Sequence, residues 1–413
     1  MDRQIVSKLG INPDKLSAMN DFVDQAYVAR NKISGYSYLL ARHGEIALTH
    51  CSGFSAMGAE SDDAHSLTPD SIFRIYSMTK PITSLLFMQL VERGDVALED
   101  KLKDYIPSFA NPLVWVDGTT SDFTTRPAER DITLLDLLTH QSGLTYDFLG
   151  EHPVDALYRR KQLSGSRNST ISLEEFCDSL ASMPLLFSPG TAWNYSFATD
   201  VIGRVIEIVT GSSLDRVMQE MIFNPLGMKD TGFQTSAKNI GRLTHCYYYD
   251  PKNRITRCVD TSKASNYLST PTLLGGGGGL LSTLPDYYRF CQMFRQGGEL
   301  NGKRIISAET IKFMQKNHLY HQGDLEGYAT GAFSENGAEG NGFGIGGSIV
   351  LDPSKTVNAT SLGSFSWGGL ANTYFWIDPD KDLIFIFMTQ IIPTGCYPLR
   401  QELSERIYDS LVD

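Results

Sequence analysis

The sequence predicts an α+β fold in which one antiparallel sheet is assembled from both ends of the chain. Two observations support this: strand-like alternation of apolar residues occurs near residues 36–50 and again after residue 343, whereas helical patterns and turn signals dominate residues 95–265. Early and late strands that flank a helical segment imply one sheet with that segment inserted. We therefore expect an α/β domain from residues 1–94 and 266–413, and a mostly helical domain from residues 95–265.

The individual elements follow from local patterns along the chain. Apolar residues at helical spacing predict helix within residues 1–33, and His43-Gly44 joins two alternating segments into a hairpin. An apolar run predicts a helix from residue 77 to 93 that stops at Gly94. The C-terminal part then predicts a helix at 285–294, strands at 343–351, 360–366, 372–378 and 383–390, and a closing helix at 400–411.

Composition excludes several classes of function. The chain has 413 residues, which is too long for one compact core, and its 41% hydrophobic and 20% charged residues are typical of a globular protein. A net charge of −11 argues against nucleic acid or an anionic membrane as partner. No apolar stretch approaches the ~20 residues that a membrane span needs. We expect a small-molecule substrate, and the sequence leaves the oligomeric state open.

Cysteine and histidine usage gives two further expectations. Six cysteines without C-x-x-C pairs predict free buried thiols in a reducing compartment, and the first residues lack the apolar core of a signal peptide. Both features favour a cytoplasmic enzyme. The eight histidines form no H-E-x-x-H motif, and His318 and His321, three residues apart, are interpreted as lacking a carboxylate partner for a metal site. We therefore expect no metal site and no cofactor.

The sequence Ser77-Met78-Thr79-Lys80 places a hydroxyl and an amine three residues apart at the start of a predicted helix. Residues at this spacing share a helix face, so the amine can reach the hydroxyl. The free N–H groups at a helix N-terminus would also stabilise an oxyanion. Ser-x-x-Lys is the nucleophile signature of penicillin-binding proteins and serine β-lactamases. The motif is short, and a surface serine beside a solvated lysine is the structural alternative.

Further motifs follow in a fixed order. Tyr195 comes after Pro189-Gly190 and precedes an apolar helix, and Trp367-Gly368-Gly369 opens onto a predicted strand. Between them lie five glycines at 275–279, which lack the Lys-Ser/Thr ending of a phosphate-binding loop and are interpreted as a cleft wall. No G-x-S-x-G motif of the α/β-hydrolases is present.

In this order and spacing, the motifs resemble the class C β-lactamase-like superfamily, and within it the family VIII carboxylesterases. The resemblance spans roughly residues 35–410. It implies a β-lactamase-like fold with the active site in the cleft between the α/β and helical parts. It also implies that Ser77 is the nucleophile, Lys80 its partner and Tyr195 the general acid/base. The N–H groups of Ser77 and Leu370 would form the oxyanion hole.

The sequence leaves open which group takes the serine proton. Lys80 can act as the base only when it is neutral; alternatively it remains charged and holds Tyr195 as a phenolate.

Two departures from the penicillin-recognising enzymes favour ester substrates. Those enzymes carry Lys-Thr-Gly where this chain has Trp367-Gly368-Gly369, and Tyr-x-Asn where it has Tyr195-Ser196-Phe197. The lost lysine would meet the β-lactam carboxylate, and the lost asparagine its amide side chain. We expect Trp367, Gly368, Gly369 and Phe197 to form an apolar substrate site for short-chain carboxylic esters. The alternatives are cephalosporin hydrolysis, acyl transfer to an alcohol at the same site, and a non-enzymatic binding module.

Overall fold

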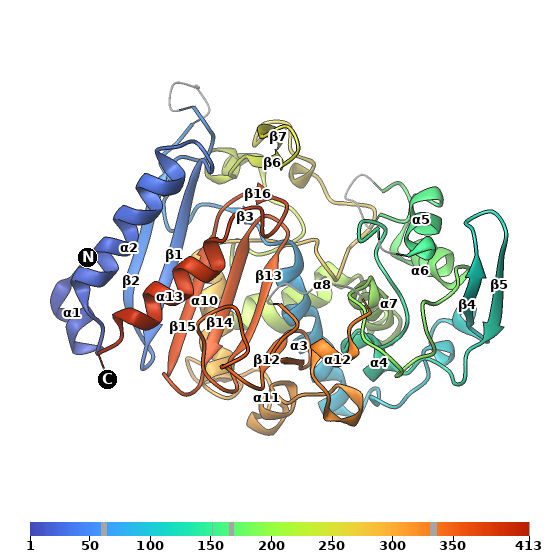
Figure 1. The fold of residues 1–413 in the computed structure, drawn as a ribbon. Coiled ribbons are helices and arrows are strands. Elements are labelled where there is room, and N and C mark those ends of the chain that lie inside the picture. The colour runs from blue at the N-terminus through green and yellow to red at the C-terminus, as the bar shows by residue number, and fades with distance from the viewer. Residues whose placement is uncertain (59–63, 151, 165–168, 331–336, 413) are drawn as a thin grey trace.

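The computed structural model describes residues 1–58, 64–150, 152–164, 169–330 and 337–412. A seven-stranded antiparallel sheet has the order β11-β12-β13-β14-β15-β1-β2 (Figure 1). Strand β1 pairs with β15 over six residues, so the N-terminal hairpin joins the C-terminal strands in one sheet. The predicted α+β class with a sheet built from both chain ends is therefore confirmed. The strands are β1 Gly35–Arg42, β2 Glu45–Gly53, β11 Asn341–Phe343, β12 Ser348–Val350, β13 Phe365–Gly369, β14 Thr373–Asp378 and β15 Leu383–Met388.

Alternating side chains give the sheet two apolar faces. One face carries Tyr38, Phe385 and Tyr374, and it is covered by helices from both chain ends. The other face carries Leu39, Ile386 and further aliphatic residues, and it packs against the central helices. The covering helices are α1 Arg3–Lys8, α2 Pro13–Val23 and α13 Leu399–Ser410 on the first face, with α3 Thr79–Arg93, α10 Leu284–Arg295, α11 Ala308–Met314 and α12 Leu325–Tyr328 on the side of the second.

A helical lobe lies beside the sheet, to the right in Figure 1. It contains α4 Leu134–Leu138, α5 Pro153–Arg160, α6 Leu173–Ala181, α7 Ala198–Thr210, α8 Leu214–Met218 and α9 Asn224–Leu226, with the hairpin of β4 Leu113–Gly118 and β5 Phe123–Pro127 at its far side. A second hairpin, β6 Cys246–Asp250 and β7 Ile255–Asp260, lies within the predicted helical range. Its strand β6 pairs in parallel with β16 Ile391–Ile392 from the C-terminal part of the chain. Two further antiparallel pairs join β3 Phe73–Arg74 to β8 Leu281–Ser282 and β9 Glu299–Leu300 to β10 Lys303–Arg304.

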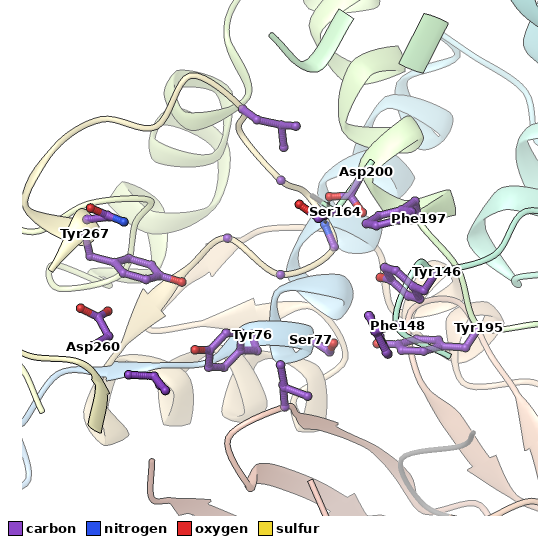
Figure 2. Close-up of a pocket in the computed structure, with 18 of the residues that line it drawn as sticks. Tyr76, Ser77, Tyr146, Phe148, Ser164, Tyr195, Phe197, Asp200, Asp260 and Tyr267 are labelled. Carbon is purple, nitrogen blue, oxygen red and sulfur yellow. Dashed lines mark hydrogen bonds between the residues drawn. The ribbon is translucent and has the colours of Figure 1, made fainter. Parts of the chain in front are cut away.

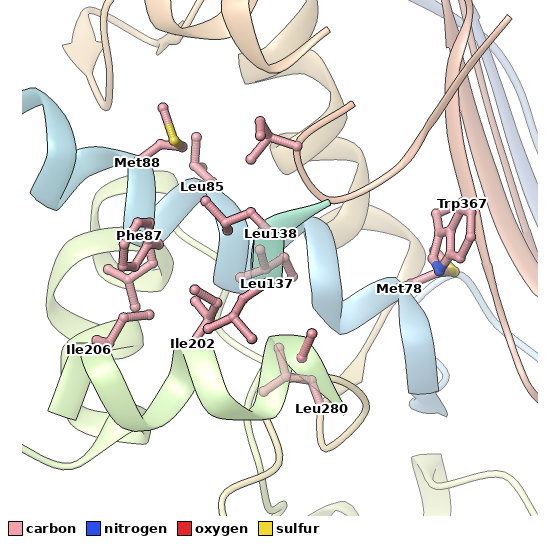
Figure 3. Close-up of a cluster of buried hydrophobic side chains, with 14 of the residues drawn as sticks. Met78, Leu85, Phe87, Met88, Leu137, Leu138, Ile202, Ile206, Leu280 and Trp367 are labelled. Carbon is pink, nitrogen blue, oxygen red and sulfur yellow. The ribbon is translucent and has the colours of Figure 1, made fainter. Parts of the chain in front are cut away.

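Helix α3 lies between the sheet and the helical lobe. Residues 79–90 are buried on all sides, and Gly94 ends the helix in a left-handed conformation with φ 77°, as the sequence predicts. Leu85 and Phe87 of α3 belong to the same apolar cluster as Ile202 of α7 (Figure 3). The sheet and the helical lobe therefore share one core across α3.

Two strand predictions near the C-terminus were wrong in detail. The predicted strand at 343–351 is split into β11 and β12, because residues 344–347 form a turn in which Gly346 has φ 88°. A Cβ on Gly346 would lie 2.8 Å from Ser84 Cβ, so this turn packs directly against α3. The strand predicted at 360–366 lies instead at Phe365–Gly369.

The cysteines and the helices bear on two remaining expectations, which are buried free thiols and the lack of a membrane span. All six cysteines are free, and three are buried, but Cys258 on β7 is exposed, contrary to the prediction of buried thiols. Across the described parts of the chain, no helix has the length and apolar character that crossing a membrane requires.

Candidate active site

Ser77 lies in a 3₁₀ turn, Tyr76–Met78, that leads directly into α3. Tyr76 adopts a left-handed conformation with φ 42°, a sharp turn immediately before the serine. Lys80 is in the first turn of α3 and is only 1% exposed. Its Nζ donates to Ser77 Oγ at 3.3 Å. The structure thus brings the predicted serine and lysine together on one side of the helix start.

The Lys80 ammonium has two further acceptors. Its Nζ donates to Tyr146 Oη at 2.9 Å and to the Gly277 carbonyl at 2.7 Å. Lys80 Nζ therefore contacts the Ser77 hydroxyl, the Tyr146 phenol and a backbone carbonyl. Neither Tyr146 nor Gly277 was predicted as a site residue. They lie 66 and 197 positions from Lys80 along the chain, so only the tertiary fold brings them to it.

Tyr195, which lies just before α7, also contacts Lys80. The centre of its ring is 4.5 Å from Lys80 Nζ, and its ring is 5.1 Å from that of Tyr146. Backbone hydrogen bonds from Asn194 to the His140 carbonyl and from Phe197 to the Thr145 carbonyl hold this segment in place. The structure therefore places Ser77, Lys80 and Tyr195 together in one site.

His140 forms the back of this site. Its ring lies 5.0 Å from the Tyr195 ring, and its Nδ1 is 3.0 Å from Ser196 Oγ. Burial and the charge of Lys80 hold the pKa of His140 well below its usual value. The imidazole is therefore neutral near pH 7 and packs against Tyr195 without adding a charge. Burial, Tyr195 and Asp200 raise the pKa of Tyr146 well above its usual value, which keeps that phenol protonated.

A cavity of about 590 Å³ opens at Ser77. Figure 2 shows Tyr76, Asp260 and Tyr267 on one side of the serine and an aromatic group on the other. The lining includes the carboxylates of Asp200 and Asp260. None of the described lining residues is a lysine or an arginine. The aromatic side consists of Tyr146, Phe148, Tyr195 and Phe197, and the glycines at 275 and 277–279 line the wall, as the sequence predicted for this run.

The two predicted oxyanion donors, Ser77 and Leu370, both line this cavity. Leu370 follows the end of β13, where a Cβ on Gly369 would lie 2.4 Å from the Ile75 carbonyl oxygen. Glycine is needed there because the strand end lies directly against the segment that precedes Ser77. The fold therefore holds the Leu370 backbone beside the nucleophile turn, and its role as a donor stays a prediction.

Trp367 does not lie where a substrate-contacting residue was expected. Its side chain is 0% exposed and is absent from the cavity lining, and its Nε1 donates to Tyr195 Oη at 3.4 Å. Alternation along β13 directs the indole into the core beneath Tyr195, where its ring is 5.3 Å from that of Phe343. Gly368 and Gly369 are also buried outside the lining, whereas Phe197 does line the cavity. The expectation of direct substrate contact is therefore corrected for Trp367.

A Trp367→Phe variant should lower kcat about fivefold without changing acyl-chain preference. It removes one hydrogen bond to Tyr195 Oη but retains an aromatic ring, and one such bond contributes about 1 kcal/mol. The measurement is kcat and kcat/KM for p-nitrophenyl acetate and butyrate. Trp376→Phe is the matched control, because the Trp376 Nε1 is buried without a hydrogen-bond partner among the described residues. A changed acetate-to-butyrate ratio in Trp367→Phe would show that the indole contacts substrate after all.

Asp200 is a further site residue that sequence reasoning missed. It lies in the first turn of α7, five residues after Tyr195, and lines the cavity with 4% exposure. The available signal was an acidic residue at the start of an otherwise apolar helix. The usual interpretation of such a residue is favourable contact with the helix dipole. Across the described residues, no three His, Cys, Asp or Glu side chains are grouped as metal ligands would be.

Comparisons with known proteins identify the family of this chain. Residues 22–401 match the beta-lactamase family. Protein Rv1367c of Mycobacterium tuberculosis is 33% identical over 327 residues, 78% of each chain. Esterase EstB of Burkholderia gladioli is 27% identical over 409 residues, 95% of each chain.

Among solved structures, EstCE1, described as a hydrolase with promiscuous acyltransferase activity, superposes with a TM-score of 0.78 at 24% identity. The alignment covers 96% of this chain and 99% of EstCE1, and it supports the fold assignment. With the family match across most of the sequence and the serine–lysine pair at the cavity, these findings establish that the chain belongs to the beta-lactamase family of serine hydrolases.

Proposed function

We propose that this protein hydrolyses short-chain carboxylic esters through a covalent acyl-enzyme on Ser77. The observation that carries the proposal is the contact between Lys80 Nζ and Ser77 Oγ, 3.3 Å long, at a cavity lined by aromatic side chains. A serine hydroxyl becomes an effective nucleophile when a positioned group accepts its proton. Lys80 and Tyr195 are the groups placed to do so.

The proposed reaction has two acyl transfers: from the ester to Ser77, and from Ser77 to water. Ser77 Oγ bonds to the ester carbonyl carbon while its proton passes to the Lys80–Tyr195 pair, and the N–H groups of Ser77 and Leu370 stabilise the oxyanion. The carbon–oxygen bond to the alcohol then breaks, and the pair returns the proton to the leaving alkoxide. Water repeats the sequence on the acyl-enzyme and releases the acid and free Ser77.

The cavity favours uncharged esters over β-lactams. A β-lactam carries a carboxylate, and the described lining offers Asp200 and Asp260 but no lysine or arginine. Asp260 is partly exposed and paired with Arg74 at 2.7 Å, whereas Asp200 is buried, and bringing an anion beside the Asp200 carboxylate is unfavourable. Phe197 lines the cavity at the position where penicillin-recognising enzymes carry an amide, and similarity to esterase EstB over most of both chains supports the same choice.

A substrate panel tests the proposal. We expect kcat/KM for p-nitrophenyl acetate or butyrate to exceed that for a chromogenic cephalosporin by about 10²-fold or more. An equal or faster cephalosporin reaction would instead make the protein a β-lactamase. If an added alcohol yields more transesterified product than free acid, the protein is an acyltransferase. An absence of both turnover and fluorophosphonate labelling would favour a binding module.

A further inference from the structure

The glycine run at 275–279 encloses the Asp200 carboxylate. A Cβ on Gly277 would lie 2.5 Å from Asp200 Oδ2, and one on Gly275 would lie 3.1 Å from Oδ1. Neither glycine has a positive φ, so backbone conformation alone does not require glycine there. The side chain of Asp200 therefore explains why positions 275 and 277 carry no side chain.

Gly277 connects Asp200 to Lys80. Its N–H donates to Asp200 Oδ1 at 3.1 Å, and its carbonyl accepts from Lys80 Nζ at 2.7 Å. The carboxylate thus fixes the backbone segment that presents an acceptor to the lysine. Because the same Lys80 Nζ contacts Ser77 Oγ, the position of Gly277 bears directly on the nucleophile.

Asp200 also places a charge close to the site. Burial raises the pKa of Asp200 overall, and the charge of Lys80 and the Gly277 N–H offset only part of this shift. Asp200 in turn raises the pKa of Tyr146. The titratable groups that face Asp200 or Lys80 come from four other parts of the chain: Lys80 on α3, His140 and Tyr146 between α4 and α5, Cys177 on α6, and Tyr195 before α7.

Resting on the proposed ester hydrolysis at Ser77, we propose that Asp200 is a positioning residue for the reaction. Its ionised carboxylate holds Gly277 against Lys80 and strengthens the proton acceptor that activates Ser77. The role is indirect, since Asp200 acts through Gly277 and through its charge rather than on the substrate.

Removing the Asp200 charge shifts the pKa of the proton acceptor in the same direction whether that acceptor is Lys80 or Tyr195. Loss of a negative neighbour favours deprotonation of Lys80, and it equally favours deprotonation of Tyr195. Either change lowers the pKa of the acceptor. The rising limb of the pH–rate profile then moves to lower pH, and the plateau rate falls because a weaker base removes the serine proton.

The test is Asp200→Asn, which retains an oxygen acceptor for the Gly277 N–H. We would measure kcat/KM for p-nitrophenyl butyrate and the rate of Ser77 labelling by a fluorophosphonate, both against pH. The rising limb should move by about one pH unit to lower pH, with a plateau about tenfold lower. Asp286→Asn is the matched control, because Asp286 is a buried carboxylate in the first turn of α10 that bonds Thr231 and the Asp230 N–H.

A second pair of variants tests the contact without changing charge. Gly277→Ala should displace the Asp200 carboxylate and lower the plateau about tenfold or more. Gly241→Ala is the control and should lose much less, because Gly241 lies outside the cavity lining and the nearest atom to its Cβ would be 3.9 Å away. If Asp200→Asn does not fold, Asp200→Ser supplies a smaller neutral acceptor for the same pH measurement.

The outcomes separate this inference from the proposed function. A limb that is unchanged, or that moves to higher pH, in a folded Asp200 variant that still labels Ser77 would overturn the role of Asp200. If the wild type labels but hydrolyses no ester, the proposed function fails, and the labelling profile still decides the question for Asp200.

Discussion

Ser77→Ala is expected to lower ester turnover by about 10⁴-fold or more while the protein remains folded. Ser77 Oγ is the atom that bonds the acyl carbon in the proposed reaction, and loss of a nucleophile removes the covalent route altogether. The side chain is small and lies at the cavity, so its loss leaves no large void in the core. The measurements are kcat/KM for p-nitrophenyl butyrate, and intact-protein mass spectrometry after fluorophosphonate treatment.

Ser84→Ala is the matched control for this variant. Ser84 lies on the same helix, α3, and its Oγ is buried without a hydrogen-bond partner among the described residues. We expect Ser84→Ala to retain activity and to carry one phosphonate adduct, which peptide mapping should place on Ser77. An adduct on any other serine, or residual turnover in Ser77→Ala close to wild type, would remove Ser77 from its proposed role.

Local sequence rules were sufficient to predict the contact between Ser77 and Lys80. Ser77 and Lys80 are three residues apart where a 3₁₀ turn leads into α3, so their contact follows from local helical spacing. Gly94 likewise ends α3 where the apolar run stops. Local geometry could not predict the position of Tyr195 beside Lys80, because that position depends on the fold of the helical lobe. Tyr195 was identified from the order of the motifs rather than from spacing.

The remaining site residues depend on contacts that no local pattern encodes. Tyr146 and Gly277 reach Lys80 from distant parts of the chain, and Asp200 meets the glycine run only in the folded state. Trp367 is another residue whose surroundings could not be predicted from the sequence pattern. Its strand was predicted to begin a few residues too early, and the partner that covers its ring is set by tertiary packing rather than by the strand pattern.

Lys80→Met and Tyr195→Phe should each lower kcat by about 10²-fold or more, as removal of general-base assistance does. Their combined effect should be far smaller than the product of the two. Lys80 Nζ lies 4.5 Å from the centre of the Tyr195 ring and also contacts Ser77 Oγ, so the two side chains serve one proton path. Residues that act as a unit lose function together, so the second loss adds little to the first.

A double-mutant cycle measures this coupling. We would determine kcat for the wild type, both single variants and the double variant on p-nitrophenyl butyrate, with a thermal melt of each to confirm folding. Tyr36→Phe is the control for loss of a buried phenol, because its hydroxyl contacts the Asn20 carbonyl on the opposite face of the sheet. If the double variant loses as much as the product of the single losses, Lys80 and Tyr195 act independently. The serine proton would then reach only one of them, and the variant with the larger loss of kcat would identify that residue.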